Sequence, residues 1–277
     1  MEAALVHARK AKTAISLGCQ SRLTATAALL ISALLSLSLS SWAFAETQTL
    51  KVAVPASGYP PFIIVEQGTV TGIVIEPLLE AAAAAGIQVD FVFLPERRAR
   101  KLLDNLQIDG RIESADWVED PHTFLWTDPI AQVDDVFIYH ERAATGFETD
   151  VAIQGAEIIA HLGYGYPALQ TLFDSGVLSR RNYPSEQKML TSLLRYSPHT
   201  KRAAVMNKQV ACWHIDKDSR FQGRFKFSKR VVGSAPLQVQ LANTPRLRPL
   251  HAALNTQLRR LQADGSIARI QKQRRCF

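Results

Sequence analysis

The chain has 277 residues, 47 % of them hydrophobic, with 32 Lys and Arg against 25 Asp and Glu. Residues 1–45 hold four of these bases and one acid, so 28 bases and 24 acids follow, a net charge of +4 over 232 residues. This mild charge, without basic runs interleaved with aromatic residues, argues against nucleic-acid binding. The length allows one large or two small domains with hydrophobic cores.

Residues 1–45 have the layout of a secretory signal peptide. The cationic start consists of Arg9, Lys10, Lys12 and Arg22. Residues 23–39 carry no charge, and Ala43-Phe44-Ala45 then places small residues at the −3 and −1 positions of a cut before Glu46. The alternative is an uncleaved membrane anchor, because the apolar run approaches the length that spans a bilayer. We predict cleavage after Ala45 and export.

Short apolar strands alternate with helices after residue 45. The first series has predicted strands at 50–54, 63–65, 89–94, 124–126 and 136–139, and helices at 76–85 and 97–106. The second has strands at 158–159, 203–206 and 237–241, and helices at 168–173, 185–194, 210–215, 250–261 and 266–272. Such alternation is typical of an α/β fold with a largely parallel sheet. We therefore predict two α/β units with boundaries near 142–150 and 228–236.

Five local strings occur in order along these elements. They are Tyr59-Pro60-Pro61-Phe62, Thr71-Gly72 before the first helix, Arg98-Ala99 with Asp109-Gly110, Thr127-Asp128-Pro129-Ile130, and Ala263-Asp264-Gly265-Ser266. Together they resemble the family 3 extracellular solute-binding proteins, the periplasmic receptors of amino-acid-type ABC importers. The resemblance spans nearly the whole chain after residue 45.

This resemblance implies a two-lobed fold of the periplasmic-binding-protein type II. Each lobe would be a mixed sheet flanked by helices, with two hinge strands between the lobes and the C-terminal helices returning to the first. The implied lobes are 46–142 with 236–277, and 143–235. The implied function is that of a monomer in the periplasm that captures a small polar or amino-acid-like ligand between its lobes. It would deliver this ligand to an ABC permease in the inner membrane, as in amino-acid transport, without a cofactor or metal.

Aromatic residues supply the first candidates for ligand contact. Tyr59 and Phe62 flank two prolines that stiffen the exit from the first strand, and stiff aromatic residues there can form a wall for a small ligand. The alternative for both is core packing beneath the hairpin. Trp117 is a further ligand-binding candidate, which, like Trp126, has core or rim packing as its alternative.

Three arginines crowd the start of the second predicted helix, where the helix dipole disfavours cations: Arg97, Arg98 and Arg100. Their placement suggests a use such as gripping a carboxylate. Arg98 matches the family position best. Arg111 is the other anion-binding candidate, with a salt bridge to Glu113 or Asp116 as its alternative, and Ser114 is included with it as a ligand-binding candidate. Which arginine faces the ligand stays open.

The family also points to two places in the second lobe. Tyr164, Gly165 and Tyr166 precede Pro167, where the family binds a ligand carboxylate through a loop and a helix N-terminus. An ordinary strand–helix turn is the alternative. Asn207 stands where family members that bind α-amino acids carry an Asp for the ammonium group. These members also carry an Arg shortly before the Asp-Pro segment, which is missing here, so the expected ligand is anionic, non-zwitterionic or differently oriented.

Other functions stay open beside this one. The family includes periplasmic cyclohexadienyl dehydratases, for which Glu113, Asp116 and His122 are candidate proton carriers. They do not form an evident acid–base pair, and we predict a protein that is not an enzyme. A stand-alone ligand sensor is a third alternative. Basic residues between 216 and 230 are predicted to form a solvated loop or, less readily, a docking face for a permease.

Two cysteines follow residue 45, Cys212 and Cys276. In an exported chain an even pair suggests a disulfide. Closing so long a loop would stabilise the fold by about 4–5 kcal/mol at most in the chain-entropy treatment. The alternative is a buried Cys212 and a free thiol at Cys276. Without a CxxC pair or clustered His, redox and zinc roles have no support.

Overall fold

The computed structural model describes residues 48–144 and 146–273. The predicted signal peptide, its cleavage site and Cys276 lie outside these residues. Cys212 is disulfide-bonded, and its pairing with Cys276 stays a prediction. In the described ranges, the helices are either too short or too polar to cross a bilayer.

The described residues form two series of strands and helices, as predicted. The first series comprises β1 (Gln48–Val54), β2 (Ile64–Glu66), β3 (Thr69–Thr71), α2 (Ile75–Ala84), β4 (Ile87–Phe93), α3 (Glu96–Asp104), β5 (Gly110–Glu113), the short 3-10 helices η2 (Ala115–Trp117) and η3 (Pro121–Thr123), and β6 (Phe124–Trp126). The long strand β7 (Ala131–His140) follows. The second series comprises α4 (Asp150–Ile153), β8 (Glu157–His161), α5 (Pro167–Asp174), β9 (Ser179–Tyr183), α6 (Glu186–Leu193), β10 (Arg202–Asn207) and α7 (Lys208–Lys217). The chain closes with β11 (Phe225–Ala242), α8 (Leu247–Ala263) and α9 (Ser266–Gln273).

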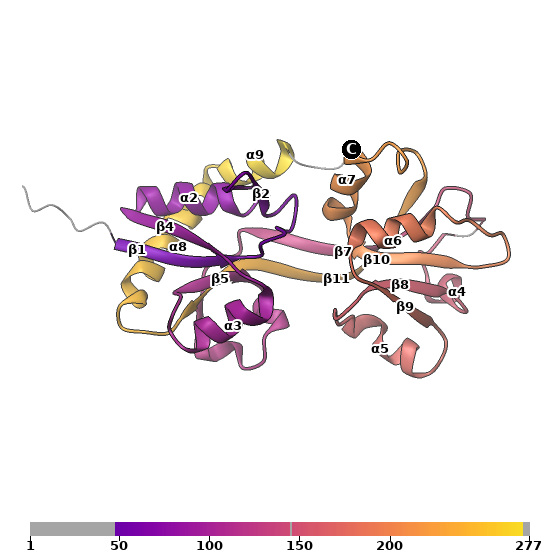
Figure 1. The fold of residues 1–277 in the computed structure, drawn as a ribbon, viewed down its shortest axis with the longest axis horizontal. Helices are drawn as coiled ribbons and strands as arrows, with labels where there is room; N and C mark the ends of the chain where they lie inside the picture. Colours follow the sequence, from indigo (N-terminus) through magenta and orange to yellow (C-terminus); the bar gives the residue numbers. More distant parts are fainter. Residues whose placement is uncertain (1–47, 145, 274–277) are drawn as a thin grey trace, which may run out of the picture. The chain divides into compact units, whose positions relative to one another are not determined.

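The main sheet has the strand order β4-β1-β5-β11-β7-β10-β8-β9, with β6 also paired to β11. Strand β1 is parallel to β4 and β5, and β8 is parallel to β9 and β10. Strand β11 is antiparallel to β5, β6 and β7. The sheet is therefore mixed. Strands β7 and β11 lie at its middle and run between the two groups of parallel strands (Figure 1).

The hydrophobic core falls into clusters on either side of this middle. One cluster contains buried residues from Leu50 to Val133 and from Leu237 to Ile267, with Val210 of α7 added. The other two contain residues between Val136 and Val232. We call the part around the first cluster the first lobe and the part around the other two the second lobe. The exact boundaries predicted for the lobes stay a prediction.

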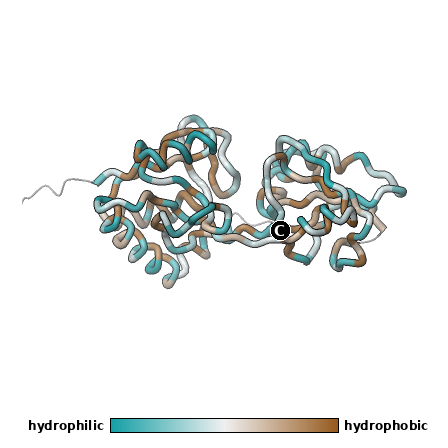
Figure 2. The backbone as a smooth tube through the Cα atoms, turned by 90° about the horizontal axis from the view of Figure 1, so that it is seen from below, coloured by the Kyte–Doolittle hydropathy of each residue, from teal (hydrophilic) through white to brown (hydrophobic). Residues whose placement is uncertain are grey.

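Helices cover both faces of each group of strands. In the first lobe, α2, α8 and α9 contact one another, and α3 lies across the strands from α2 in Figure 1. Helix α8 buries Leu247, Leu250, Leu254, Leu258 and Leu261, every third or fourth residue. Figure 2 shows hydrophobic and hydrophilic stretches alternating along the backbone. In the second lobe, α4 and α5 contribute to one core cluster and α6 and α7 to the other.

Two strands and part of a third differ from the prediction. Strand β9 has the sequence SRRNY and pairs only with β8 at the sheet edge, so its side chains face water and leave no apolar pattern. Strand β5 is buried but contains a paired Arg111 and Glu113. The predicted loop at 216–230 is wrong after residue 224: Phe225 and Phe227 are half-buried, alternate with exposed Lys226, and pair with β7.

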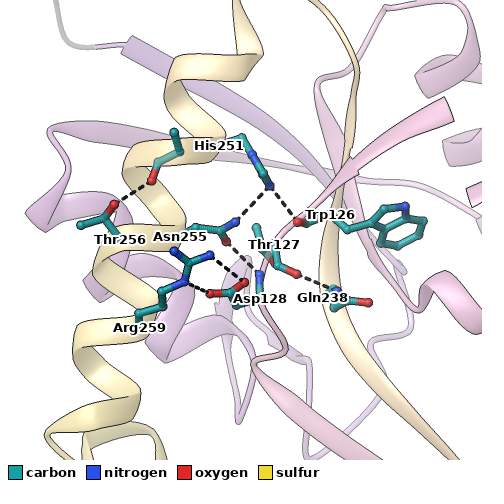
Figure 3. Close-up of polar contacts among 9 residues, drawn as sticks. Trp126, Thr127, Asp128, Gln238, His251, Asn255, Thr256 and Arg259 are labelled. Atoms are coloured by element: carbon teal, nitrogen blue, oxygen red, sulfur yellow. Dashed lines mark hydrogen bonds and ion pairs between the residues drawn. The ribbon is translucent and has the colours of Figure 1, made fainter. Parts of the chain in front are cut away.

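The Thr127-Asp128 string joins helix α8 to strand β11 in the first lobe (Figure 3). The Asn255 side-chain oxygen accepts the Asp128 N–H at 2.8 Å. Thr127 Oγ1 accepts the Val239 N–H at 2.9 Å, and Gln238 Nε2 donates to the Thr127 carbonyl at 2.6 Å. Side chains thus satisfy the backbone of this segment after β6 ends. The Thr127-Asp128 string, which resembles the family, therefore attaches helix α8 to the first lobe.

We expect Asn255→Ala to lower the free energy of unfolding by about 1–3 kcal/mol, because the Asp128 N–H loses its acceptor next to fully buried Thr127. Thr256→Ala is the matched control on the same helix: Thr256 is exposed and bonds only to the Ala252 carbonyl. Its effect should stay within about 0.5 kcal/mol. Denaturant unfolding followed by circular dichroism measures both, and equal losses would contradict the docking role.

Candidate functional site

Tyr59 is fixed by a tight loop at the end of β1. Its N–H donates to the Ile63 carbonyl at 2.8 Å, and its ring stacks on Phe62 with centroids 5.4 Å apart. Gly72 holds this loop from the other side: a Cβ there would lie 2.4 Å from the Phe62 carbonyl oxygen, and its φ is +127°. Tyr59 is half-buried, whereas Phe62 is 1 % exposed in the first core. Phe62 therefore packs in the core, which was its alternative, and ligand contact by Tyr59 stays a prediction.

The phenol of Tyr59 interacts with groups from the second lobe. Burial raises its pKa well above the ordinary tyrosine value, and Asp135, Tyr164, Glu186 and Tyr166 raise it further, in decreasing order. These groups come from β7, from the first turn of α6 and from the segment between β8 and α5. We call Tyr59, Asp135, Tyr164, Tyr166 and Glu186 the tyrosine–carboxylate cluster.

In the segment after β8, Tyr164 is exposed, whereas Tyr166 is buried and stabilises the segment. Tyr164 is 48 % exposed, and its ring stacks on His161 at 4.1 Å. Tyr166 is buried, and its hydroxyl accepts the His161 N–H at 3.0 Å. Arg180 lies over the Tyr166 ring at 5.2 Å and donates to the Tyr164 carbonyl at 2.7 Å. Gly165, between the tyrosines, is exposed.

Burial and nearby acids raise the pKa of both tyrosines. For Tyr164 burial acts first, followed by Glu186, Tyr166, Asp135 and Glu113, and the pKa is raised. For Tyr166 burial raises the pKa to about 12, against the lowering effect of the hydrogen bond from the His161 backbone. Both phenols therefore stay neutral hydrogen-bonding groups with aromatic faces.

Glu186 lies at the start of α6 with its side chain 18 % exposed. Its Oε1 is 3.9 Å from His161 Nε2, so the pair is ionic only when the imidazole is protonated. Burial lowers the pKa of His214 on α7, and Glu186 raises it in the opposite direction. The carboxylate thus lies between an imidazole and the tyrosines.

Asp135 is a charged residue inside a hinge strand. It pairs in register with Asn207 of β10 and Gly233 of β11. Burial raises its pKa to about 6, and the neighbouring charge of Asp134 adds to this. Asp134 differs from it because its Oδ1 accepts a hydrogen bond from Ser234 Oγ at 2.5 Å. Asp135 is therefore a half-buried acid, and the charged group that acts on its pKa, Asp134, is another acid.

Arg111 is committed to the fold of the first lobe. The residue is 5 % exposed, contacts Glu96 and lies 3.0 Å from Glu113 Oε2, and its Nε donates to Gln240 Oε1 at 2.6 Å. Burial lowers its pKa and Glu113 raises it, while burial raises the pKa of Glu113 against the effect of Arg111. The salt bridge that was the alternative for Arg111 is what forms.

The other predicted residues are dispersed. Arg98 is exposed on α3, and Trp117 is 55 % exposed on η2. Ser114 is fully buried, and its Oγ accepts the Asp116 N–H at 3.3 Å. Asn207 is 2 % exposed: its Oδ1 caps α7 by accepting the Val210 N–H at 3.0 Å, and its Nδ2 donates to the Asp134 carbonyl at 3.1 Å. Ser114 and Asn207 thus use their polar atoms within the fold.

The structure brings together Tyr59, Tyr164 and Tyr166 from the predicted set. Sequence reasoning missed Asp135 and Glu186. A signal for Asp135 was present, since two adjacent acids interrupt the apolar strand from Val133 to Tyr139. Glu186 gave none, because an acid in the first turn of a helix is ordinary. In the described ranges, groups of three or more His, Cys, Asp or Glu arranged to hold a metal are absent.

Asp135→Asn should change the pH dependence of stability. The folded-state pKa of Asp135 is raised from the ordinary 3.8 to about 6, so the folded protein binds the extra proton between these values. The wild type should therefore lose stability relative to Asp135→Asn as the pH rises from about 4 to about 6, by up to about 3 kcal/mol. Unfolding in denaturant at a series of pH values measures this. Asp104→Asn, at an exposed acid on α3, should leave the profile unchanged.

Comparisons with known proteins agree with this architecture. The sequence matches the bacterial extracellular solute-binding proteins, family 3, over residues 50–273. No curated protein sequence shows significant similarity to the chain. Among solved structures, an arginine 3rd transport system periplasmic binding protein from Legionella pneumophila has a TM-score of 0.60 at 18 % identity, over 80 % of this chain and 97 % of that one.

Two further structures show the same likeness. The GluR0 ligand-binding core in complex with L-glutamate has a TM-score of 0.63 at 16 % identity, over 81 % of this chain and 97 % of that one. The ancestral amino-acid-binding protein AncCDT-1, described as a precursor of cyclohexadienyl dehydratase, has a TM-score of 0.59 at 16 % identity, over 81 % and 94 %. These likenesses confirm the predicted two-lobed fold. Since the family match covers almost all the described residues, the chain belongs to the bacterial extracellular solute-binding proteins of family 3.

Proposed function

We propose that the protein captures a small polar or amino-acid-like solute between its lobes and delivers it to an ABC importer. The observation that carries this proposal is the tyrosine–carboxylate cluster, in which Tyr59 of the first lobe interacts with Asp135 of strand β7 and with three groups of the second lobe. Residues far apart in sequence supply polar atoms and aromatic faces at one place. Family membership adds the expectation that the ligand lies between the lobes.

The chemistry of the cluster suits ligand binding. Tyrosine side chains give large contact areas at a small cost in conformational entropy, and their hydroxyls orient a polar ligand. A solute that touches both Tyr59 and Tyr164 gains contacts from both lobes at once. Such a solute favours whichever arrangement of the lobes allows both contacts, because a ligand shifts an equilibrium only through differential affinity. This is the physical basis of capture between two hinged lobes.

The proposed location is the periplasm, and the proposed partner is a permease of the inner membrane. The family name describes extracellular proteins, and the sequence of residues 1–45 predicts a cleavable signal peptide. We further propose that the protein acts as a monomer, since one chain supplies both lobes.

An enzyme on the same fold is the second candidate, and one observation favours it. The pKa of Asp135, raised to about 6, suits a proton carrier near neutral pH. The residues first considered for this role are less suitable: Glu113 is paired with Arg111, and Asp116 and His122 are exposed. Binding is preferred because Asp135 lacks a second acid or base within hydrogen-bond reach among the described residues.

Tyr164→Ala should weaken binding of a solute found by a thermal-shift screen at least about tenfold, which is about 1.4 kcal/mol. The cause is the loss of an exposed aromatic face that contributes to the cluster. Tyr196→Ala is the matched control: Tyr196 is 36 % exposed in the same lobe and stacks on His140 at 4.9 Å, as Tyr164 stacks on His161. Isothermal titration calorimetry measures both affinities, and an equal loss in both variants would remove Tyr164 from the site.

The purified protein should not turn over prephenate or related cyclohexadienyl acids. Product formation followed by absorbance tests this with wild type and with Asp135→Asn. Turnover by the wild type that is lost in Asp135→Asn would make the enzyme the better proposal and would assign the proton transfer to that residue.

A further inference from the structure

We propose that the ligand is a small organic cation, held by the carboxylates of Asp135 and Glu186 and by the faces of Tyr59 and Tyr164, and not a zwitterion gripped by an arginine. This inference rests on the proposed function, because it names the ligand class of the same site. Three observations support it: the sign of the charges that act on the tyrosines, the partners of Arg180 and Arg111, and the pairing of β7 with β10.

Charges of one sign act on Tyr59 of the first lobe and on Tyr164 of the second. The charged groups that act on Tyr59 are Asp135 and Glu186, and those that act on Tyr164 are Glu186, Asp135 and Glu113. All of them are acids. Of the three tyrosines of the cluster, only Tyr166 has a cation among the groups that act on its pKa, and this cation is Arg180. A ligand at the tyrosines therefore meets a negative potential.

Two arginines, Arg180 and Arg111, are bonded to other groups of the protein. Arg180 donates from Nε to Asn182 at 2.8 Å and from Nη2 to the carbonyls of His161 and Tyr164. Arg111 is shared by Glu96 and Glu113, so two carboxylates surround one guanidinium and the group keeps a net negative charge. A ligand carboxylate at Arg111 or Arg180 would have to displace one of these partners.

The carboxylates of the cluster lack such compensation. Asp135 makes no ion pair within the described residues, and its strongest charged neighbour is another acid, Asp134. Glu186 Oε1 lies 3.9 Å from His161 Nε2, and this pair is ionic only when the imidazole is protonated. Holding unpaired carboxylates away from water is unfavourable. A bound cation would relieve this cost, whereas an anion would increase it.

The register of the sheet explains the Asn207 position. Asp135 on β7 lies directly opposite Asn207 on β10. An aspartate at 207 would face Asp135 across the strands, and like charges directly opposite each other destabilise a sheet. The carboxylate that the family places at the end of this strand is thus replaced by one on the neighbouring strand. The site keeps an acid for a cationic group, while Arg111 and Arg180 are bonded to other partners.

The tyrosine faces complete the recognition. Tyr59 is stacked on one side by Phe62 and Tyr164 on one side by His161, which leaves the other face of each ring unoccupied by these partners. A cation over the face of a tyrosine gains about 0.5–2 kcal/mol, more where water is excluded. Carboxylates and aromatic faces together select an ammonium or a guanidinium group.

Isothermal titration calorimetry with a charge-sorted set of probes tests the inference. The probes are putrescine and agmatine as cations without a carboxylate, arginine as a cation with one, and glutarate as an anion. We expect putrescine or agmatine to bind and glutarate not to bind. Glu186→Gln and Asp135→Asn, both nearly isosteric, should each weaken the cation at least tenfold. Glu80→Gln, at an exposed acid of α2, is the matched control and should bind as the wild type does.

The outcomes separate this inference from the function on which it rests. Failure of both putrescine and agmatine to bind, or unchanged binding in Glu186→Gln and Asp135→Asn, overturns the cationic ligand. If glutarate or a neutral solute then binds and Tyr164→Ala abolishes that binding, the solute-binding function stands without the inference. If the probe arginine binds at least tenfold more tightly than agmatine, the protein recognises the carboxylate of the probe. That result would overturn the inference that the site does not grip a ligand carboxylate.

Discussion

The antiparallel pairing of β7 with β11 is the constraint on which the rest of the structure depends. It runs from Leu237 opposite Ala131 to Phe225 opposite His140, and β11 then continues into the sheet of the first lobe. The register shifts between Phe227 and Val231 and between Val231 and Gly233 interrupt the ladder near Asp135. An irregular ladder at this point gives a strand interior that accepts a charged residue. The same strands that join the lobes therefore carry an acid to the tyrosines.

Buried charge is handled in two different ways on the two sides of this ladder. In the first lobe, Arg111 is enclosed by Glu96, Glu113 and Gln240, so the burial of a guanidinium is offset by ion pairs and a hydrogen bond. In strand β7, partial burial raises the pKa of Asp135, and its charged neighbour Asp134 repels it. The first arrangement stabilises a fold, whereas the second is costly unless something else is bound. Unequal treatment of buried charges is typical of functional sites.

The regular elements could be predicted from the sequence wherever burial imposes a period on the side chains. The leucines of α8 recur every three or four residues, and the apolar run of β1 is buried on both faces, so both elements were predicted. Strand β9 could not be predicted, because an edge strand exposes its side chains and carries no such period. Tyr59 and Tyr164 could be predicted because proline or glycine beside an aromatic residue marks a loop exit. The two adjacent acids in an apolar strand were a signal for Asp135, but its meeting with Glu186 could not be predicted, since it depends on strand register and helix placement and not on spacing along the chain.

The position of Asn207 shows why a family motif has to be checked in three dimensions. From the sequence, an asparagine in place of an aspartate indicates a lost ammonium site. In the structure, the asparagine caps α7, binds the Asp134 carbonyl, and faces Asp135 across the strands. An acid at both positions would place two like charges opposite each other, so one of them has to be neutral. The amide of Asn207 and the carboxylate of Asp135 therefore act together. The amide orders the end of β10 and the start of α7. The charge lies on the neighbouring strand β7, where it acts on the tyrosines of both lobes.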